Sequence, residues 1–262
     1  MLLSDFMKNI VFQIIVLTVL TGCSIKEDRT QCPCTVMVDF SGIDSVRHGI
    51  TDILALTDGA VVLDDRVPSA RYDELYTFRA RRVSTTVDIY SGWTGDSVAG
   101  KGFTVNEGEQ FPELYLQTEQ LDTDKESVSL TAMLHKSFCR VTIDIKSEGD
   151  YPYSLSVTGN ACGYTCSGET VPGAFEYSPI PDQAGLCSVR IPRQYDSSLI
   201  LRIAEDNDIL REFALGEYIV KSGYDWKAED LEDVSVEIDY AKADVVFKVN
   251  DWETTVSFDV II

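Results

Sequence analysis

Histidine is scarce in this sequence. Only His48 and His135 occur among its 262 residues, and neither has neighbours at metal-ligand spacing. Catalysis by a histidine base and zinc chemistry are therefore not expected. Cations are scarce as well: 22 lysines and arginines are outnumbered by 43 acidic residues, which leaves a net charge of −21. This charge excludes a nucleic-acid partner, because phosphate binding requires clustered cations.

Motifs of catalysis are missing too. The chain contains no G-x-S-x-G, H-E-x-x-H or G-x-x-x-x-G-K-[ST] pattern. Its carboxylates are so numerous that no particular pair indicates a glycosidase. We therefore predict a protein that is not an enzyme, with no catalytic residues, metal, cofactor or small-molecule substrate. Trp93, Trp226 and Trp252 offer a sugar-binding platform as an alternative, but packing in a core is the favoured role of such rings.

A hydrophobic run long enough to cross a bilayer is not seen near the start of the chain. The apolar run Ile10–Leu20 has eleven residues, whereas a transmembrane helix needs about 20 and a signal-peptide core about 7–15. Lys8 supplies the positive charge that precedes such a core, and either Met1 or Met7 is the start. Residues 1–22 are therefore predicted to be a signal peptide.

The run ends in Leu-Thr-Gly-Cys, with the cysteine at position 23. This ending resembles the bacterial lipobox, in which small residues precede a cysteine that receives an S-diacylglycerol and an N-acyl chain such as palmitate. An ordinary thiol after a conventional signal peptide is the alternative. Each buried methylene contributes about 0.8 kcal/mol, so several chains on Cys23 would anchor the protein stably.

The residues after the cysteine suggest a location. Ser24 and the charged segment 26–28 (KED) resemble the outer-membrane sorting and surface-export signals of Bacteroidetes-type lipoproteins. We therefore expect a lipid-anchored protein of the outer membrane that faces the cell surface, with residues 23–34 as its lipidated tether.

From Thr35 onward the hydrophobic pattern has a period of two, and no long amphipathic helix is visible. Asp58-Gly59 is a strong hairpin signal between two apolar runs. One short helix is predicted at Ala214–Ser222. Many short strands separated by turn residues indicate an all-β protein built from antiparallel β-sandwiches. The strands are expected at 53–57, 60–63, 83–90, 114–117, 128–134, 138–145, 153–157, 189–191, 199–203, 234–240, 243–249 and 252–262.

One sandwich of this length would be large, so a boundary is needed. The polar break at 135–137 lies between two strand runs and divides the chain after the tether into two similar halves. We predict an N-terminal sandwich at 35–136 and a C-terminal sandwich at 137–262. No repeat is visible between the halves, so their similarity rests on size and period.

Six cysteines remain when Cys23 is set aside: Cys32, Cys34, Cys139, Cys162, Cys166 and Cys187. An exported protein can pair them, and six cysteines allow fifteen connectivities, so the pairing stays open. Disulfides and free buried thiols are both compatible with the sequence. A thiolate metal site from Cys32, Cys34, Cys162 and Cys166 is disfavoured, because zinc sites prefer C-x₂₋₄-C pairs in reduced compartments.

The order of these features resembles a known family. The lipobox cysteine, KED (26–28), CPC (32–34), LTAMLHKSFCRVTIDI (130–145) and GYDWKAEDLEDVSVEIDY…VNDWE (223–253) are together similar to the FimB-like anchoring subunits of Bacteroidetes fimbriae. The resemblance implies two transthyretin-like sandwiches in tandem. It also implies a position at the base of a fimbrium, control of fimbrial length and a shaft subunit as partner. Only Cys23 has a role that transfers individually.

The hypothesis is therefore a structural subunit that fixes a fimbrium to the outer membrane. A surface glycan-binding lipoprotein is the alternative. The predicted partner-binding segment is the last strand, in which the residues of one face are Trp252, Val256, Phe258, Val260 and Ile262. Such a segment suits strand addition to a neighbouring subunit. It is equally suited to be the closing strand of its own sandwich.

Overall fold

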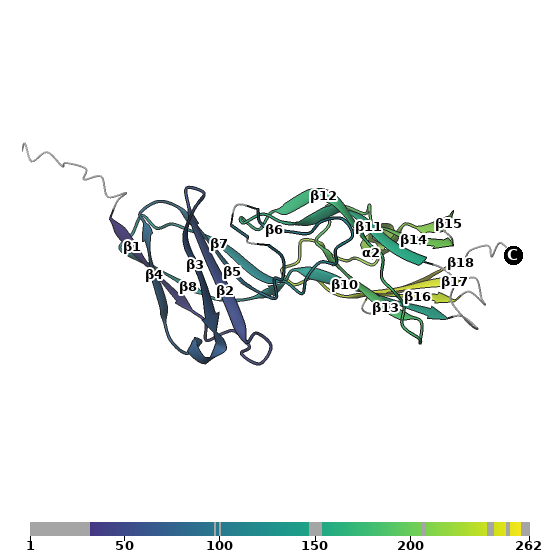
Figure 1. Ribbon diagram of the computed structural model, residues 1–262, viewed down its shortest axis with the longest axis horizontal. Helices are drawn as coiled ribbons and strands as arrows, with labels where there is room; N and C mark the ends of the chain where they lie inside the picture. The colour runs from purple at the N-terminus through teal and green to yellow at the C-terminus, as the bar shows by residue number, and fades with distance from the viewer. Residues whose placement is uncertain are drawn as a thin grey trace, which may run out of the picture.

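The computed structural model describes residues 32–96, 98–99, 101–146, 154–205, 208–239, 244–249 and 252–257. These residues form two β-sandwiches that lie end to end along the long axis of the molecule (Figure 1). The all-β class and the tandem arrangement are confirmed, whereas the transthyretin-like assignment stays a prediction. The expected signal peptide and Cys23 lie outside the described residues.

The first sandwich packs a three-stranded sheet, ordered β4-β1-β8, on a five-stranded sheet, ordered β3-β2-β5-β7-β9. Alternating residues of β1 and β5, including Val36, Val38, Val87 and Ile89, are fully buried between the sheets. Its strands are β1 (Pro33–Asp39), β2 (Ile50–Thr57), β3 (Ala60–Pro68), β4 (Tyr76–Arg81), β5 (Thr85–Ser91), β7 (Tyr115–Leu121), β8 (Ser127–Thr131) and β9 (His135–Lys136).

The second sandwich packs the sheet β13-β10-β16-β17-β18 on the sheet β12-β11-β14-β15, and the short β6 also pairs with β11. Val141, Ile143 and Val157 are among its fully buried residues. Its strands are β6 (Phe103–Thr104), β10 (Phe138–Lys146), β11 (Ser154–Tyr164), β12 (Thr170–Tyr177), β13 (Leu186–Pro192), β14 (Ile200–Glu205), β15 (Asp208–Phe213), β16 (Val234–Asp239), β17 (Asp244–Val249) and β18 (Trp252–Ser257).

The two sandwiches repeat one strand topology. In the first, β1 lies between β4 and β8, and β2, β5 and β7 follow β3 in the facing sheet. In the second, β10 lies between β13 and β16, and β11, β14 and β15 follow β12. Each of these pairs has the same direction in both sandwiches. The chain therefore contains two copies of one seven-strand unit, although its halves show no visible sequence repeat.

The expectation of purely antiparallel sheets is wrong for one pair in each sandwich. Strand β1 runs parallel to β8, and β10 runs parallel to β16. Parallel neighbours need a long connection between them. Here the connection is the rest of the seven-strand unit, so the pairing leaves no local signal in the sequence.

Turns and helices follow the sequence closely. Asp58 and Gly59 have φ values of 52° and 74°, the left-handed pair that a two-residue type I′ hairpin requires. The predicted helix is present as α2 (Leu215–Lys221), and a single 3₁₀ turn, η1, covers Ser69–Arg71. Among the described residues, no helix has the length and apolar character needed to cross a membrane. Strand β1 begins at Pro33, so the last two residues of the expected tether belong to the strand.

Asp88 is an exception to the apolar core. Its side chain in β5 is 0% exposed. The hydroxyl of Thr118 donates to Asp88 Oδ1 at 2.6 Å, while Oδ2 has no partner among the described residues. Burial raises the pKa of Asp88 to about 7 despite the hydrogen bond from Thr118. In the unfolded chain, the pKa of an aspartate is about 3.9. The folded state therefore loses stability as the pH rises from about 4 to 7.

We predict that Asp88→Asn removes this loss, because asparagine keeps an acceptor for Thr118 and carries no charge. The variant should melt several degrees above the wild type at pH 8, and the gap should shrink at pH 5. Thermal unfolding of both proteins across this pH range measures the effect. Equal pH dependence of the two proteins would show that Asp88 does not titrate in this range.

Candidate functional site

The two sandwiches share one hydrophobic core at their junction. Leu54, Leu56 and Tyr90 lie on the first sandwich, on the face of its five-stranded sheet that points away from its own core. They belong to the same cluster of buried residues as Phe138 and Val141 of the second sandwich. Domains of one chain move relative to one another unless their interface is large and hydrophobic. This continuous core joins the sandwiches into one body.

The segment between β5 and β7 contributes to both sandwiches. It leaves the first sandwich after Ser91, supplies β6 to the second and returns as β7. Phe103 and Phe111 of this segment are fully buried in the shared core. At Gly163 of β11, a Cβ atom would lie 1.9 Å from the carbonyl oxygen of Phe103, so only glycine permits this approach.

A loop of the second sandwich clamps the strand that links the two units. The backbone N–H of Lys136 donates to Asp230 Oδ1 at 2.7 Å, and the N–H of Leu231 donates to the Lys136 carbonyl at 2.9 Å. The N–H of Arg140 donates to Asp233 Oδ1 at 2.9 Å. The segments 130–145 and 223–233, which carry the family resemblance, therefore meet at the junction.

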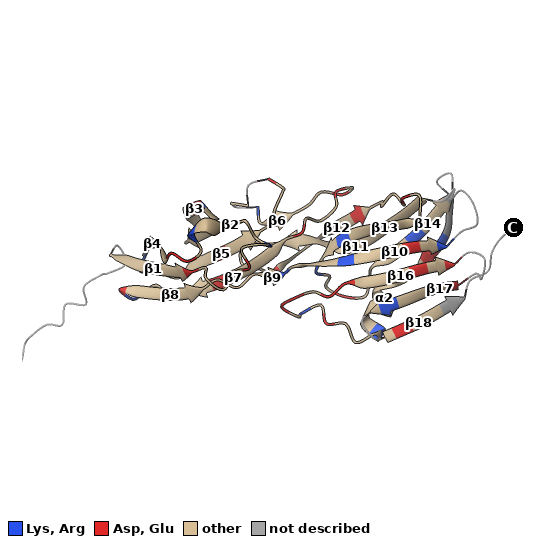
Figure 2. Ribbon diagram, turned by 90° about the horizontal axis from the view of Figure 1, so that it is seen from below, with Lys and Arg blue, Asp and Glu red and all other residues tan. Residues whose placement is uncertain are grey.

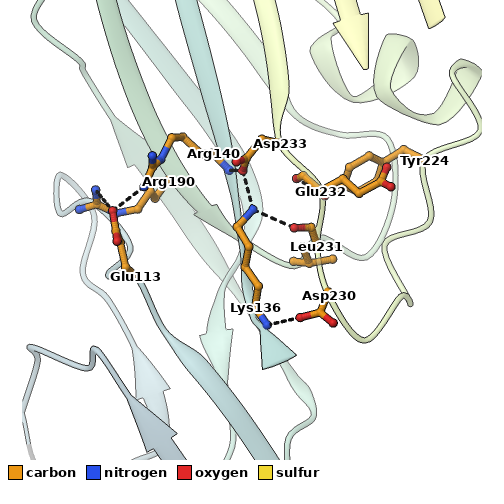
Figure 3. A network of polar contacts seen from close by, with 9 residues as sticks. All are labelled: Glu113, Lys136, Arg140, Arg190, Tyr224, Asp230, Leu231, Glu232 and Asp233. Atoms are coloured by element: carbon orange, nitrogen blue, oxygen red, sulfur yellow. Dashed lines mark hydrogen bonds and ion pairs between the residues drawn. The ribbon is translucent and has the colours of Figure 1, made fainter. Parts of the chain in front are cut away.

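Lys136 is the centre of this clamp. Figure 3 shows its ammonium group directed at Asp233 and the carbonyl of Leu231; the distances are 2.5 and 2.8 Å. The same group lies 4.8 Å from the centre of the Phe138 ring. Only 18% of the Lys136 side chain is exposed, so its interactions are less screened by water than those of a surface ion pair.

A second ion pair fixes the other side of β10. Arg140 donates to Glu113 at 2.5 Å, and Arg190 of β13 approaches the same carboxylate at 3.5 Å (Figure 3). The Arg190 side chain also donates to the carbonyl of Phe111 at 2.9 Å. Glu113 precedes β7 of the first sandwich, so this pair links the two units directly.

The clamp has a pH dependence of its own. Burial alone would raise the pKa of Asp230, but hydrogen bonds from the Lys136 N–H and the His135 side chain outweigh it and lower the pKa. Because the folded pKa is depressed, the contribution of Asp230 to stability is present above about pH 4 and is lost on further acidification.

The Cys139 thiol is buried. Burial raises its pKa to about 12, so this thiol stays protonated.

The cysteines do not form a metal site. No group of three or more metal-ligating side chains gathers within the described ranges. Cys32 and Cys34 lie at the start of the first sandwich, whereas Cys162 and Cys166 lie in or beside β11 of the second. All six cysteines after Cys23 are free thiols, and Cys32 is exposed. Of the two possibilities that the sequence left open, the structure has free thiols.

The tryptophans pack against the core. Trp226 is buried, and Trp93 and Trp252 are partly buried against the shared cluster. The Trp93 ring meets Phe103 edge-on, with ring centres 5.5 Å apart. The rings therefore take the core role that the sequence favoured and do not form an exposed platform.

The predicted partner-binding segment is described only in part. Trp252 opens β18, which pairs antiparallel with β17 and ends its sheet. Val256 lies opposite Val245, but its side chain is outside the described part, as are Phe258, Val260 and Ile262. Residues 252–257 thus extend a sheet of their own sandwich, and the binding role of the segment stays a prediction.

Cavities also gather at the junction. Three cavities, of about 570, 410 and 370 Å³, are lined by residues of both sandwiches. In the cavity of 410 Å³, the carboxylates of Glu113 and Asp233 are paired with Arg140 and Lys136. These are the ion pairs that hold the junction, and the arrangement is that of a structural site.

We predict that Asp233→Ala weakens the junction, because the Lys136 ammonium and the Arg140 N–H lose their acceptor. Since Asp233 is half-exposed, the free energy of unfolding should fall by about 1–2 kcal/mol. Asp96→Ala is the matched control: it removes an ion pair with Lys101 whose partners are both largely exposed, and its effect should be near zero. Urea unfolding measures both variants. Equal stabilities would contradict a structural role for the clamp.

No family model matches this sequence, and no curated protein matches it. Solved structures do. A candidate adhesin from Bacteroides thetaiotaomicron aligns with a TM-score of 0.55 and 14% identity, over 88% of this chain and all of that one. A candidate polysaccharide-binding protein from the same species has a TM-score of 0.55 and 11% identity, over 87% and 99% of the two chains.

The fimbrial anchor protein Mfa2 from Porphyromonas gingivalis also aligns, with a TM-score of 0.55 and 11% identity, over 85% of this chain and 99% of that one. None of the three is described as an enzyme, in agreement with the missing catalytic motifs. The expected tandem arrangement of two sandwiches is confirmed: this chain shares its fold with the fimbrial anchor from Porphyromonas gingivalis and with the two Bacteroides proteins.

Proposed function

We propose that this protein is a fimbrial anchor of the outer membrane, with no enzymatic activity. Acyl chains on Cys23 fix it to the membrane on the cell surface, and a fimbrial shaft subunit binds to its folded part. In this role it limits fimbrial length, as the resemblance implies. The fold shared with Mfa2 supports the proposal.

The observation that carries the proposal is the position of the lipid signal relative to the folded body. Strand β1 begins ten positions after Cys23, at the end of the first sandwich that lies away from the second (Figure 1). The lipid would therefore hold the elongated body at one end, and the edges of its sheets would lie clear of the attachment point for a shaft subunit to bind.

The alternative is a surface glycan-binding lipoprotein. The structural similarity to a candidate polysaccharide-binding protein favours it. The packing of Trp93, Trp226 and Trp252 speaks against it, because carbohydrate platforms need exposed aromatic faces. The anchor therefore accounts for more of the molecule. The C-terminal segment from Trp252 remains part of the proposal as a shaft-binding element.

We predict that Cys23→Ala releases the protein from the membrane, because no acyl chain can then be attached. Fractionation should move the protein from the outer membrane to the soluble fraction, and fimbriae should be shed with it. Cys32→Ala is the matched control, since Cys32 is an exposed free thiol close by in sequence, and it should change neither location nor attachment. Membrane retention of Cys23→Ala would contradict the lipid anchor. Released protein with firmly attached fimbriae would contradict the anchoring role.

A further inference from the structure

The repeated topology exposes a difference between the two sandwiches. In the second, the outer edge of β16 is covered by β17 and then β18. In the first, the equivalent strand β8 ends its sheet, and no described strand pairs with its outer edge. Figure 2 shows β8 at one margin of the first sandwich, and β17 and β18 filling the same side of the second.

The backbone of β8 shows which groups this edge offers. The carbonyl of Glu126 accepts from the N–H of Thr35, and the N–H of Ala132 donates to the carbonyl of Asp39. The backbone N–H and C=O groups of the even-numbered residues of β8 therefore point toward β1. The backbone groups of the odd-numbered residues point outward, because the N–H and C=O of one residue face the same side of a strand. The N–H and C=O of Ser127 and Ser129 therefore face outward without a described partner, while the carbonyl of Thr131 accepts from the Gln117 side chain.

The side chains at this edge are incompletely covered. Val128 and Leu130 of β8 are partly buried against the core of the first sandwich. In β16, where β17 covers the edge, Val234, Val236 and Ile238 are 0–1% exposed. The covering strand β17 turns Val245, Phe247 and Val249 inward at alternate positions. An added strand with the same alternation would complete the first sandwich.

Before Thr131, where the Gln117 side chain caps the edge, β8 is also unprotected. Edge strands of stable proteins are usually blunted by charged residues, proline or bulges, which prevent pairing with another chain. Serine, valine, leucine and threonine make up β8, without charge or proline. Apart from the two-residue β6, which pairs only with β11, the other strands that end the four sheets each contain a charged residue or a proline. They are β3, β4, β9, β12, β13, β15 and β18.

We propose that the outer edge of β8 binds an extended segment of a fimbrial subunit, antiparallel to β8, as β17 binds β16. This inference rests on the proposed function and names a docking edge for it. The segment would carry apolar residues at alternate positions to cover Val128 and Leu130. In the exposed turn before β8, Asp122 pairs with Lys125 and Glu126 lies 3.9 Å from Arg82. A lysine or arginine at the flank of the segment would therefore face Asp124.

A proline at position 129 tests the outer edge of β8 separately from the rest of the protein. The N–H of Ser129 points outward, so Ser129→Pro removes a donor for an added strand and leaves the ladder with β1 intact. Ser129→Ala is the matched control, because it keeps the N–H. The probe is the purified shaft subunit of the source bacterium, tested against the purified lipoprotein in detergent. We expect Ser129→Pro to weaken binding at least about tenfold and Ser129→Ala to change it less than about twofold.

Hydrogen exchange gives a second readout that needs no variant. The amides of Ser127 and Ser129 should exchange quickly in the free protein, those of Val128 and Leu130 slowly, and binding should slow the first pair. Deleting residues 258–262 tests in parallel whether the C-terminal segment contributes to binding of the shaft subunit. A wild type that does not bind the shaft subunit overturns both this inference and the proposed function. A wild type that binds, with Ser129→Pro binding equally and no new protection in β8, overturns the docking edge alone.

Discussion

The hydrophobic core that crosses the junction is the constraint on which the rest of the molecule depends. A β-sandwich needs apolar residues only on the inner faces of its sheets. Here Leu54, Leu56 and Tyr90 make the outer face of one sheet apolar too, and the second sandwich covers it. Exposing this face to water would be costly, at about 25 cal/mol per Å² of apolar surface. The two units are therefore expected to stay docked.

The polar clamp fixes the orientation in which the two sandwiches dock. Burial of apolar area is non-directional, whereas hydrogen bonds from the backbone of Lys136 and Arg140 to Asp230 and Asp233 fix the linking strand in one register. The ion pair between Arg140 and Glu113 does the same across the junction. A body held in this way has no hinge between its two sandwiches.

Strands with clear alternation were predictable from the sequence, and so was the hairpin at Asp58-Gly59, because both signals are local. β12 was missed, since Pro172 and Gly173 interrupt its pattern and its pairing with β11 shifts register. β4 was missed although its buried and exposed residues alternate along its whole length. Arg79 and Arg81 lie on its exposed side.

The contacts at the junction could not be predicted from the sequence, for a different reason. Lys136 and Asp233 are separated by 97 positions, and nothing local indicates that they meet. The segment of Lys136 was predicted as a polar break between two domains, and that of Asp233 entered only through a family resemblance, without a stated role. The repeated topology was equally hidden, because the parallel pairs β1–β8 and β10–β16 join strands from the two ends of each unit. Which edge is open follows from that pairing alone.

Calorimetric unfolding of the chain from residue 24 to 262 tests the central claim most directly, namely that the two sandwiches form one body. The shared core predicts a single cooperative transition, in which the calorimetric enthalpy equals the van't Hoff enthalpy. Two transitions, or a calorimetric enthalpy about twice the van't Hoff value, would show that the sandwiches unfold independently and would contradict the account.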